Sequence, residues 1–248
     1  ATAVPRGAWS CMWHASCASG VPPPLTTEES LKHLLKSIDQ VVTNPGDFWT
    51  VTPTAEDYDR GRFGDPWGRL YRAREERAIR RALHDFPRRG RVLDVACGTG
   101  RVTALLVSEG FAEVAATDVS FAMMDVAKRR LPQVEFFQGD ATHLPVGDNS
   151  FDGITCIGLL MHLDARQRVA VLKELRRISR GPVVVQYGCV GPFLRVASRI
   201  MRRPAGGVRY PVVPSQLRTD LRASALRERA RFWALRPFSS SLILALTK

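Results

Sequence analysis

Cysteine, lysine and long apolar runs are all scarce in this chain of 248 residues. The five cysteines, at positions 11, 17, 97, 156 and 189, are odd in number and include no CxxC pair, which argues against a disulfide framework and a structural zinc site. No apolar run exceeds the length of a β-strand, so the sequence predicts neither a membrane-spanning helix nor the apolar core of a signal peptide. These absences predict a soluble protein of the reducing cytoplasm.

Basic residues are abundant, but lysine supplies only five of the 36, and the formal net charge is +12. The 31 arginines are spread along the whole chain, and neither a basic patch with interleaved aromatic residues nor an appended binding module accompanies them. We attribute most of the charge to a bias in composition. The charge pattern therefore predicts no specific binding to nucleic acid.

The run VLDVACGTG at 92–100 predicts a buried strand that ends in a glycine-rich turn and leads into a helix over 102–107. Gly98 and Gly100 have no Cβ, so a ligand can approach the backbone closely. A P-loop would need Gly-Lys-Ser/Thr where this chain has GRV, and a dinucleotide fingerprint needs three glycines and leaves Asp94 unexplained. The turn predicts a nucleotide-like ligand of another kind.

Two further acidic residues, Asp118 and Asp140, stand at or just after the ends of expected strands. Asp118 ends a strand over 113–118, at the distance of about 20 residues from the glycine turn at which a carboxylate accepts hydrogen bonds from ribose hydroxyls. Val119 is then expected to lie along the base. Asp140 follows a strand over 134–138, where the alternative interpretation is a turn aspartate.

Together these runs resemble the class I S-adenosylmethionine (SAM) methyltransferases. The family motif Asp-x-x-Cys/Gly-Gly-x-Gly is matched at 94–100, its Ser-x-x-Met-Leu segment at 120–128, and its leucine-proline, turn, Ser-Phe-Asp passage at 144–152. The resemblance covers residues 91–248 well and residues 1–90 weakly. It implies an enzyme whose cofactor is SAM.

The fold class implied is α/β, a doubly wound, mostly parallel sheet of seven strands with the last strand antiparallel, as in the Rossmann-like methyltransferase fold. The residues agree, because an amphipathic helix over 165–179 precedes an apolar strand over 182–187. A helix over 216–223 and strands over 228–235 and 242–247 complete the pattern. A length of 248 residues with 45% apolar content suits one α/β domain.

The resemblance also implies a set of cofactor contacts. In the resembling family the acid at the place of Asp140 accepts a hydrogen bond from the adenine amino group, and we expect Tyr58, Arg62 or Arg69 to meet the methionine carboxylate. Ordinary salt bridges are the alternative for each arginine, and core packing is the alternative for Met123. The predicted cofactor-binding residues are Tyr58, Arg62, Arg69, Asp94, Ala96, Cys97, Gly98, Gly100, Asp118, Val119, Met123, Asp140, Ala141, Cys156 and Ile157.

The segment after the fourth strand, 158–163, bears on the acceptor. It lacks the Asn/Asp-Pro-Pro-Tyr/Phe signature of amino-group methylation on DNA bases, and it resembles the small-molecule and quinone branch, in which a histidine stands where His162 does. Histidine, with an ordinary pKa of about 6.5, suits removal of a proton from a hydroxyl acceptor near neutral pH. The alternative is a histidine that only shapes the pocket floor.

Three regions outside the motifs complete the predicted organisation. Residues 1–25 are expected to be a flexible tail. Residues 26–90 are expected to form a helical lid and to lead into the SAM-binding domain at 91–248. Within that domain, 188–214 is expected to cover the acceptor. Its apolar residues alternate with arginines, which predicts peripheral contact with an anionic membrane or cover over an acidic, apolar substrate; a plain surface helix is the alternative.

The sequence thus predicts a SAM-dependent methyltransferase that acts on oxygen or an activated carbon of a small or lipid-like acceptor, by in-line displacement without a metal. RNA methylation and a non-catalytic SAM-binding regulator remain alternatives. Convergence of Cys97, Cys156 and Cys189 near the active face, as soft metalloid chemistry would need, is a further hypothesis; their alternative role is apolar packing. The sequence leaves the acceptor's identity and the oligomeric state open.

Overall fold

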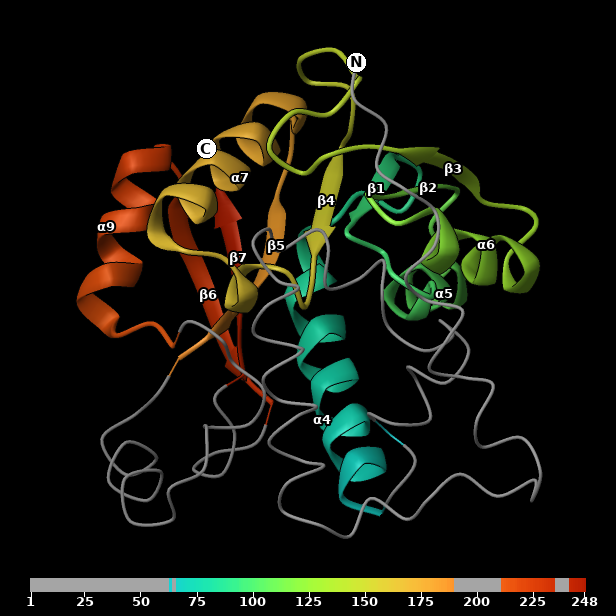
Figure 1. Cartoon of the computed structure of the whole chain (residues 1–248), viewed down its shortest axis with the longest axis horizontal. Coiled ribbons are helices and arrows are strands. Elements are labelled where there is room, and N and C mark those ends of the chain that lie inside the picture. The colour runs from blue at the N-terminus through green and yellow to red at the C-terminus, as the bar shows by residue number, and fades with distance from the viewer. Residues whose placement is uncertain (1–62, 64–65, 190–210, 235–240) are drawn as a thin grey trace, which may run out of the picture. The chain divides into compact units, whose positions relative to one another are not determined.

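A seven-stranded sheet organises the part of the chain that the computed structural model describes, which is residues 63, 66–189, 211–234 and 241–248 (Figure 1). All of these residues belong to one compact unit, residues 44–248. Tyr58, Arg62, most of the expected acceptor cover at 188–214 and most of the expected lid lie outside the described residues.

The strands follow the order β3-β2-β1-β4-β5-β7-β6. All neighbours pair in parallel except β7, which runs antiparallel to both β5 and β6. The strands are β1 (Arg91–Val95), β2 (Glu113–Asp118), β3 (Glu135–Gln138), β4 (Gly153–Cys156), β5 (Val183–Gly188), β6 (Arg227–Trp233) and β7 (Ser241–Thr247). The predicted fold class, including the reversed last strand, is confirmed.

Two of the described helices begin at a side-chain cap. Ser120 accepts a hydrogen bond from the Met123 N–H at the start of α6, and Asp164 forms a capping box with Gln167 at the start of α7. The helices are α4 (Pro66–Ala82), α5 (Arg101–Ser108), α6 (Phe121–Arg130), α7 (Ala165–Ile178) and α9 (Pro214–Ser224), with short 3₁₀ turns η1 (Leu83–Asp85) and η2 (Leu160–His162). Within the described ranges, none of them has the length and apolar character needed to cross a membrane.

The sheet is covered on both faces, because alternate residues of its central strands point to opposite sides. Val183 and Val185 of β5 pack in the core with residues of α7 and α9, whereas Val184 packs with residues of α4 and α5. In Figure 1, α7 and α9 lie beside β5, β6 and β7, and α5 and α6 lie beside β1, β2 and β3. This is the doubly wound arrangement that the alternating elements predict.

The strand register brings the predicted motifs to one edge of the sheet. Val95 of β1 lies opposite Thr117 of β2 and Cys156 of β4, and Asp118 lies opposite Gln138 of β3. The four strands therefore end together, and their following loops form one rim. Ligands of open α/β sheets bind at this carboxyl edge.

Candidate functional site

In the glycine turn after β1, every second residue from 96 to 100 has a left-handed backbone: φ is +58° at Ala96, +55° at Gly98 and +83° at Gly100. A Cβ built on Gly98 would meet nothing within 4 Å, so this side of the turn is open. A Cβ on Gly100 would lie 2.9 Å from the Cβ of Ala127, because α5 and α6 pack closely there. Gly98 thus leaves space for a ligand, whereas Gly100 permits helix packing.

Asp118, at the end of β2, holds this turn in place. Its Oδ2 accepts a 2.8 Å hydrogen bond from the Gly98 N–H, and its Oδ1 accepts a 2.9 Å bond from the Ser120 N–H. Burial raises the pKa of Asp118, and the hydrogen bonds from backbone N–H groups oppose that rise. A carboxylate has roughly four acceptor positions, so both oxygens keep capacity for a ligand's hydroxyls.

Asp94 faces the protein core. Its two oxygens accept hydrogen bonds from the hydroxyls of Thr103 (2.7 Å) and Thr155 (2.8 Å), which tie β1 to α5 and to β4. Burial raises the pKa of Asp94 to about 6, while the hydrogen bonds from the two threonines and the charge of Arg101 act in the opposite direction. Asp94 therefore anchors the strand beneath the glycine turn, and its predicted contact with the cofactor stays a prediction.

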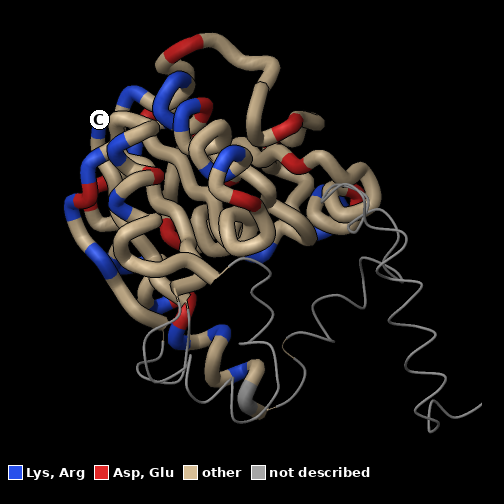
Figure 2. Tube along the Cα trace, turned by 60° about the vertical axis from the view of Figure 1, so that its left-hand side comes forward, with Lys and Arg blue, Asp and Glu red and all other residues tan. Residues whose placement is uncertain are grey.

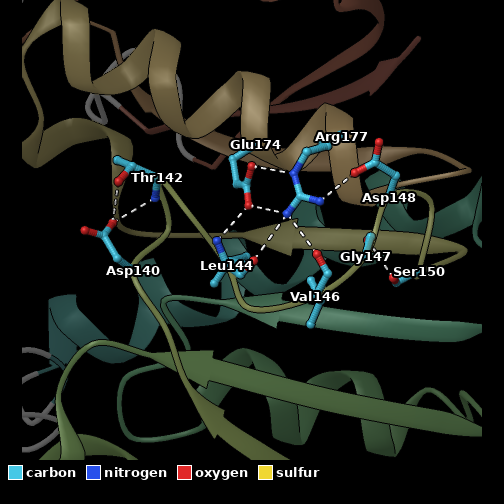
Figure 3. Close-up of polar contacts among 9 residues, drawn as sticks. All are labelled: Asp140, Thr142, Leu144, Val146, Gly147, Asp148, Ser150, Glu174 and Arg177. Carbon is cyan, nitrogen blue, oxygen red and sulfur yellow. Dashed lines mark hydrogen bonds and ion pairs between the residues drawn. The ribbon is translucent and has the colours of Figure 1, made fainter.

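Asp140 is exposed on the loop after β3. Its Oδ1 accepts two 2.8 Å hydrogen bonds, from the N–H and the hydroxyl of Thr142 (Figure 3), as an aspartate in a turn does. No other described residue donates to its second oxygen, so the turn role leaves room for the predicted adenine contact. Ala141 beside it is half-buried against the core.

The loop from 144 to 148 is fixed to α7 by two residues that the sequence patterns did not reveal (Figure 3). Arg177 Nη2 donates to the carbonyls of Leu144 (3.2 Å) and Val146 (2.9 Å), and Glu174 Oε1 accepts from the Leu144 N–H (2.7 Å). The hydrogen bonds from Arg177 lower the pKa of Glu174, in spite of its burial. The pair holds the rim segment that follows Asp140.

The rim after β4 carries the predicted proton acceptor. Cys156 and Ile157 are buried, Gly158 has φ +90° with open space beyond it, and His162 is half-buried on η2. Arg168 of α7 donates a 3.0 Å hydrogen bond to the carbonyl of the residue after His162. The structure therefore places His162 on the loop that follows β4 at the carboxyl edge of the sheet, and Arg168 holds the end of that loop.

The three described cysteines are buried in two apolar clusters. Cys97 belongs to the apolar cluster that includes Met124 of α6, whereas Cys156 and Cys189 belong to the cluster beneath α7. Burial raises the pKa of all three thiols, to about 11 for Cys189. Neutral, buried thiols act as apolar packing, and the described ranges contain no group of His, Cys, Asp and Glu side chains suited to a metal.

The remaining predicted contacts differ in exposure. Val119 is 47% exposed beside the neighbouring Phe121 at 65%, and Met123 is buried. Arg69 is exposed on α4, and its predicted contact with the methionine carboxylate stays a prediction. Sequence patterns also missed a buried polar cluster around Glu75 behind the glycine turn.

Comparisons with known proteins agree with this geometry. Residues 92–181 match the family model described as a methyltransferase domain. The demethylmenaquinone methyltransferase of Renibacterium salmoninarum is 38% identical over 118 residues, which is 46% of this chain and 48% of that protein. An O-methyltransferase of Penicillium expansum is 41% identical over 93 residues, which is 35% of this chain and 34% of that protein. The chain thus spans about half, or less, of the length of these curated relatives.

A solved structure extends the likeness in fold. The magnesium protoporphyrin IX methyltransferase from Synechocystis PCC 6803, solved with bound S-adenosylhomocysteine (SAH), superposes with a TM-score of 0.67 at 19% identity. The match covers 85% of this chain and 98% of that one, so the fold continues well beyond residues 92–181. Residues 92–181 therefore match a methyltransferase domain, and the motifs and the fold around them resemble those of the class I SAM-dependent methyltransferases.

Proposed function

We propose that this chain transfers a methyl group from SAM to a small or lipid-like acceptor, at oxygen or at an activated carbon. The observation that carries the proposal is the 2.8 Å hydrogen bond from the Gly98 N–H to Asp118 Oδ2, at a turn with an open face. This bond fixes a glycine turn and a carboxylate side by side at the sheet edge where such folds bind ligands.

The residues present fit SAM. Asp118 would accept from the ribose hydroxyls, Asp140 would accept from the adenine amino group, and Gly98 would let the ligand approach the backbone. When bound, SAM supplies a methyl group on a positively charged sulfur, which the acceptor displaces in line. Asp94 and Asp118 are two neighbouring buried carboxylates whose negative charge favours a cationic ligand.

The chain's own contribution to the transfer is to align the acceptor, exclude water and remove a proton. We assign the last step to His162, whose imidazole would take the proton of a hydroxyl acceptor as the oxygen forms its bond to the methyl carbon. The hydrogen bond from Arg168 to the end of the His162 loop supports this assignment, because it limits the motion of the base.

The names of the relatives favour a quinone-like or phenolic acceptor. The Renibacterium protein is named for demethylmenaquinone, and the Penicillium protein is named for oxygen as the methylated atom. A quinone in its reduced, quinol form and a phenol both carry a ring hydroxyl, and loss of that proton makes the oxygen, or the ring carbon next to the C–O bond, nucleophilic. For this chain the acceptor class remains part of the proposal.

Calorimetry with SAH tests the cofactor site. Asp118→Ala removes a charged acceptor of two hydrogen bonds, so we expect SAH binding to weaken by about 1–3 kcal/mol. Asp125→Ala is the matched control, since Asp125 lies on the neighbouring helix α6, is 65% exposed and pairs with Arg129. Equal SAH affinity of a folded Asp118→Ala protein and the control would remove the cofactor assignment.

A screen for methyl transfer from tritiated SAM tests the acceptor. Quinone, phenol and lipid pools are offered alongside total RNA, and His162→Gln is assayed on whichever acceptor is labelled. We expect label in a quinone or phenol pool and a large loss of turnover with His162→Gln at unchanged SAH affinity. Label in RNA alone would replace the acceptor class, and SAH binding without any turnover would favour a SAM-binding regulator.

Peripheral contact with an anionic membrane is the last part of the proposal, and sequence alone supports it. Arginines 195, 199, 202 and 203 alternate with apolar residues in the segment that lies outside the described residues. Each basic residue near an anionic surface contributes about 1 kcal/mol, so a variant with glutamine at all four positions should lose most of its affinity for phosphatidylserine vesicles. Full vesicle affinity of that variant would reject the membrane contact.

A further inference from the structure

A fully buried carboxylate, Glu75 of α4, collects three hydrogen bonds behind the glycine turn. It accepts from Arg101 Nη2 at 2.6 Å, from the Tyr71 hydroxyl at 2.8 Å and from Gln186 Nε2 at 2.5 Å. Gln186 of β5 also donates to the Ser241 hydroxyl of β7 at 2.6 Å. The cluster therefore joins α4, the start of α5 and two strands, and it fixes the direction of the Arg101 side chain.

Arg101 directly follows the glycine turn. It is the first residue of α5 and follows Gly100, the N-cap of that helix. Its guanidinium carbon lies 5.2 Å from the centre of the Phe63 ring, and its side chain is 14% exposed. Glu75 binds one terminal nitrogen and the ring contacts the guanidinium, so the guanidinium is held on two sides.

The other terminal nitrogen of Arg101, Nη1, is buried and makes no hydrogen bond within the described part of the chain. A buried cationic donor without a partner is costly and rare in folded proteins. A guanidinium with one edge already fixed by a carboxylate is prepared to bind a second carboxylate with the other edge. Arg101 begins α5 directly after Gly100, so this charge stands at the end of the glycine turn.

We propose that Arg101 Nη1 binds the carboxylate at the amino-acid end of SAM and SAH, and that Glu75 is the positioning residue that orients Arg101. The inference rests on the proposed function, since it names a binding residue of that same site. The carboxylate is the one anionic group of the cofactor, and Arg101 directly follows the glycine turn whose open side is at Gly98. Arg101 would then make the contact with the methionine carboxylate that the family resemblance led us to expect from Tyr58, Arg62 or Arg69.

The test pairs a residue with a single group of the ligand. Isothermal calorimetry compares SAH with decarboxylated SAH, which keeps the ammonium, the thioether and the adenosine and lacks only the carboxylate. We expect Arg101→Met to weaken SAH about 10- to 100-fold, the size of one charge-assisted hydrogen bond, and to leave decarboxylated SAH within about twofold of wild type. Glu75→Gln should show the same split between the two ligands with a smaller loss.

Arg72→Met is the matched control, because Arg72 also stacks on Phe63, at 5.9 Å, but pairs with the half-buried Glu76. It should bind both ligands as wild type does. If Arg101→Met does not fold, Arg101→Lys keeps a charge beside Glu75 while it removes the planar fork, and the same split is expected. Binding of the decarboxylated ligand shows in each case that the adenosine site is intact.

Two results would overturn the inference: equal weakening of both ligands by the Arg101 variants, which indicates a structural role, and no weakening of either. Failure of the proposed function looks different, because wild-type protein would then bind neither ligand. Binding of both ligands by wild type, with the carboxylate preference lost only in the Arg101 and Glu75 variants, supports the inference.

Discussion

Arg168 and Asp220 form a buried ion pair between α7 and α9, with Nε 2.7 Å from Oδ2 and side chains only 3% and 4% exposed. Tyr187 of β5 donates a 3.3 Å hydrogen bond to the same carboxylate oxygen. Because Arg168 also donates to the carbonyl of Leu163, the pair connects α9 and the sheet to the loop that carries His162. The geometry of the acceptor side thus depends on a charge pair in the core.

Removing one member of this pair should destabilise the fold strongly. Asp220→Ala leaves the Arg168 guanidinium buried without its counter-charge, and we expect the free energy of unfolding in urea to fall by about 3–5 kcal/mol. The double variant Arg168→Met, Asp220→Leu removes both charges and should recover much of that loss. If Asp220→Ala lowers the free energy of unfolding by less than about 1 kcal/mol, the Arg168–Asp220 ion pair is not buried in solution.

Asp94 should give the protein an unusual dependence of stability on pH. Burial raises its pKa from the ordinary value of 3.8 to about 6, so between these two values the folded protein binds more protons than the unfolded chain. The contribution of Asp94 to stability is therefore complete below pH 4 and is lost as the pH rises through 6. A shift of about two units corresponds to about 3 kcal/mol.

Asp94→Asn tests this sign. An amide can accept from one threonine and donate to the hydroxyl of the other, so both contacts persist without a buried charge. We expect the variant to match wild type near pH 4 and to exceed its free energy of unfolding by up to about 3 kcal/mol at pH 8, measured in urea. A difference that stays constant over this range would contradict the assignment.

The fold, and the position of Gly98 and Asp118 at one edge of the sheet, could be predicted from the sequence because both depend on local patterns; the contact of these two residues with the cofactor stays a prediction. A glycine turn after an apolar strand and an acid at the end of the next strand are visible in short segments. The Glu75–Arg101–Gln186 cluster was not predictable in this way, because Glu75 and Gln186 are 111 residues apart in the chain. Only tertiary packing decides which buried acid meets which arginine.

Asp94 and Asp140 show a different limit of sequence reasoning. An acidic residue in or just after a β-strand can face either a ligand or the core, and the neighbouring residues in the sequence do not show which. The structure turns Asp94 toward Thr103 and Thr155, and these hydroxyl groups come from other elements. For Asp140, both the turn role and the predicted ligand role fit, because one oxygen serves the turn.

Two glycines with the same backbone strain should separate stability from cofactor binding. Gly98 has φ +55° and Gly110, at the end of α5, has φ +78°, and a Cβ at either position meets nothing within 4 Å. Alanine at each position should therefore cost about 1–2 kcal/mol of stability through left-handed strain alone. Only the methyl group of Gly98→Ala would project into the space proposed for the cofactor.

We expect SAH affinity to fall at least about tenfold in Gly98→Ala and to remain unchanged in Gly110→Ala, with thermal unfolding reporting similar stability for both. Equal SAH affinity in the two variants would mean that the open side of the glycine turn does not face the ligand.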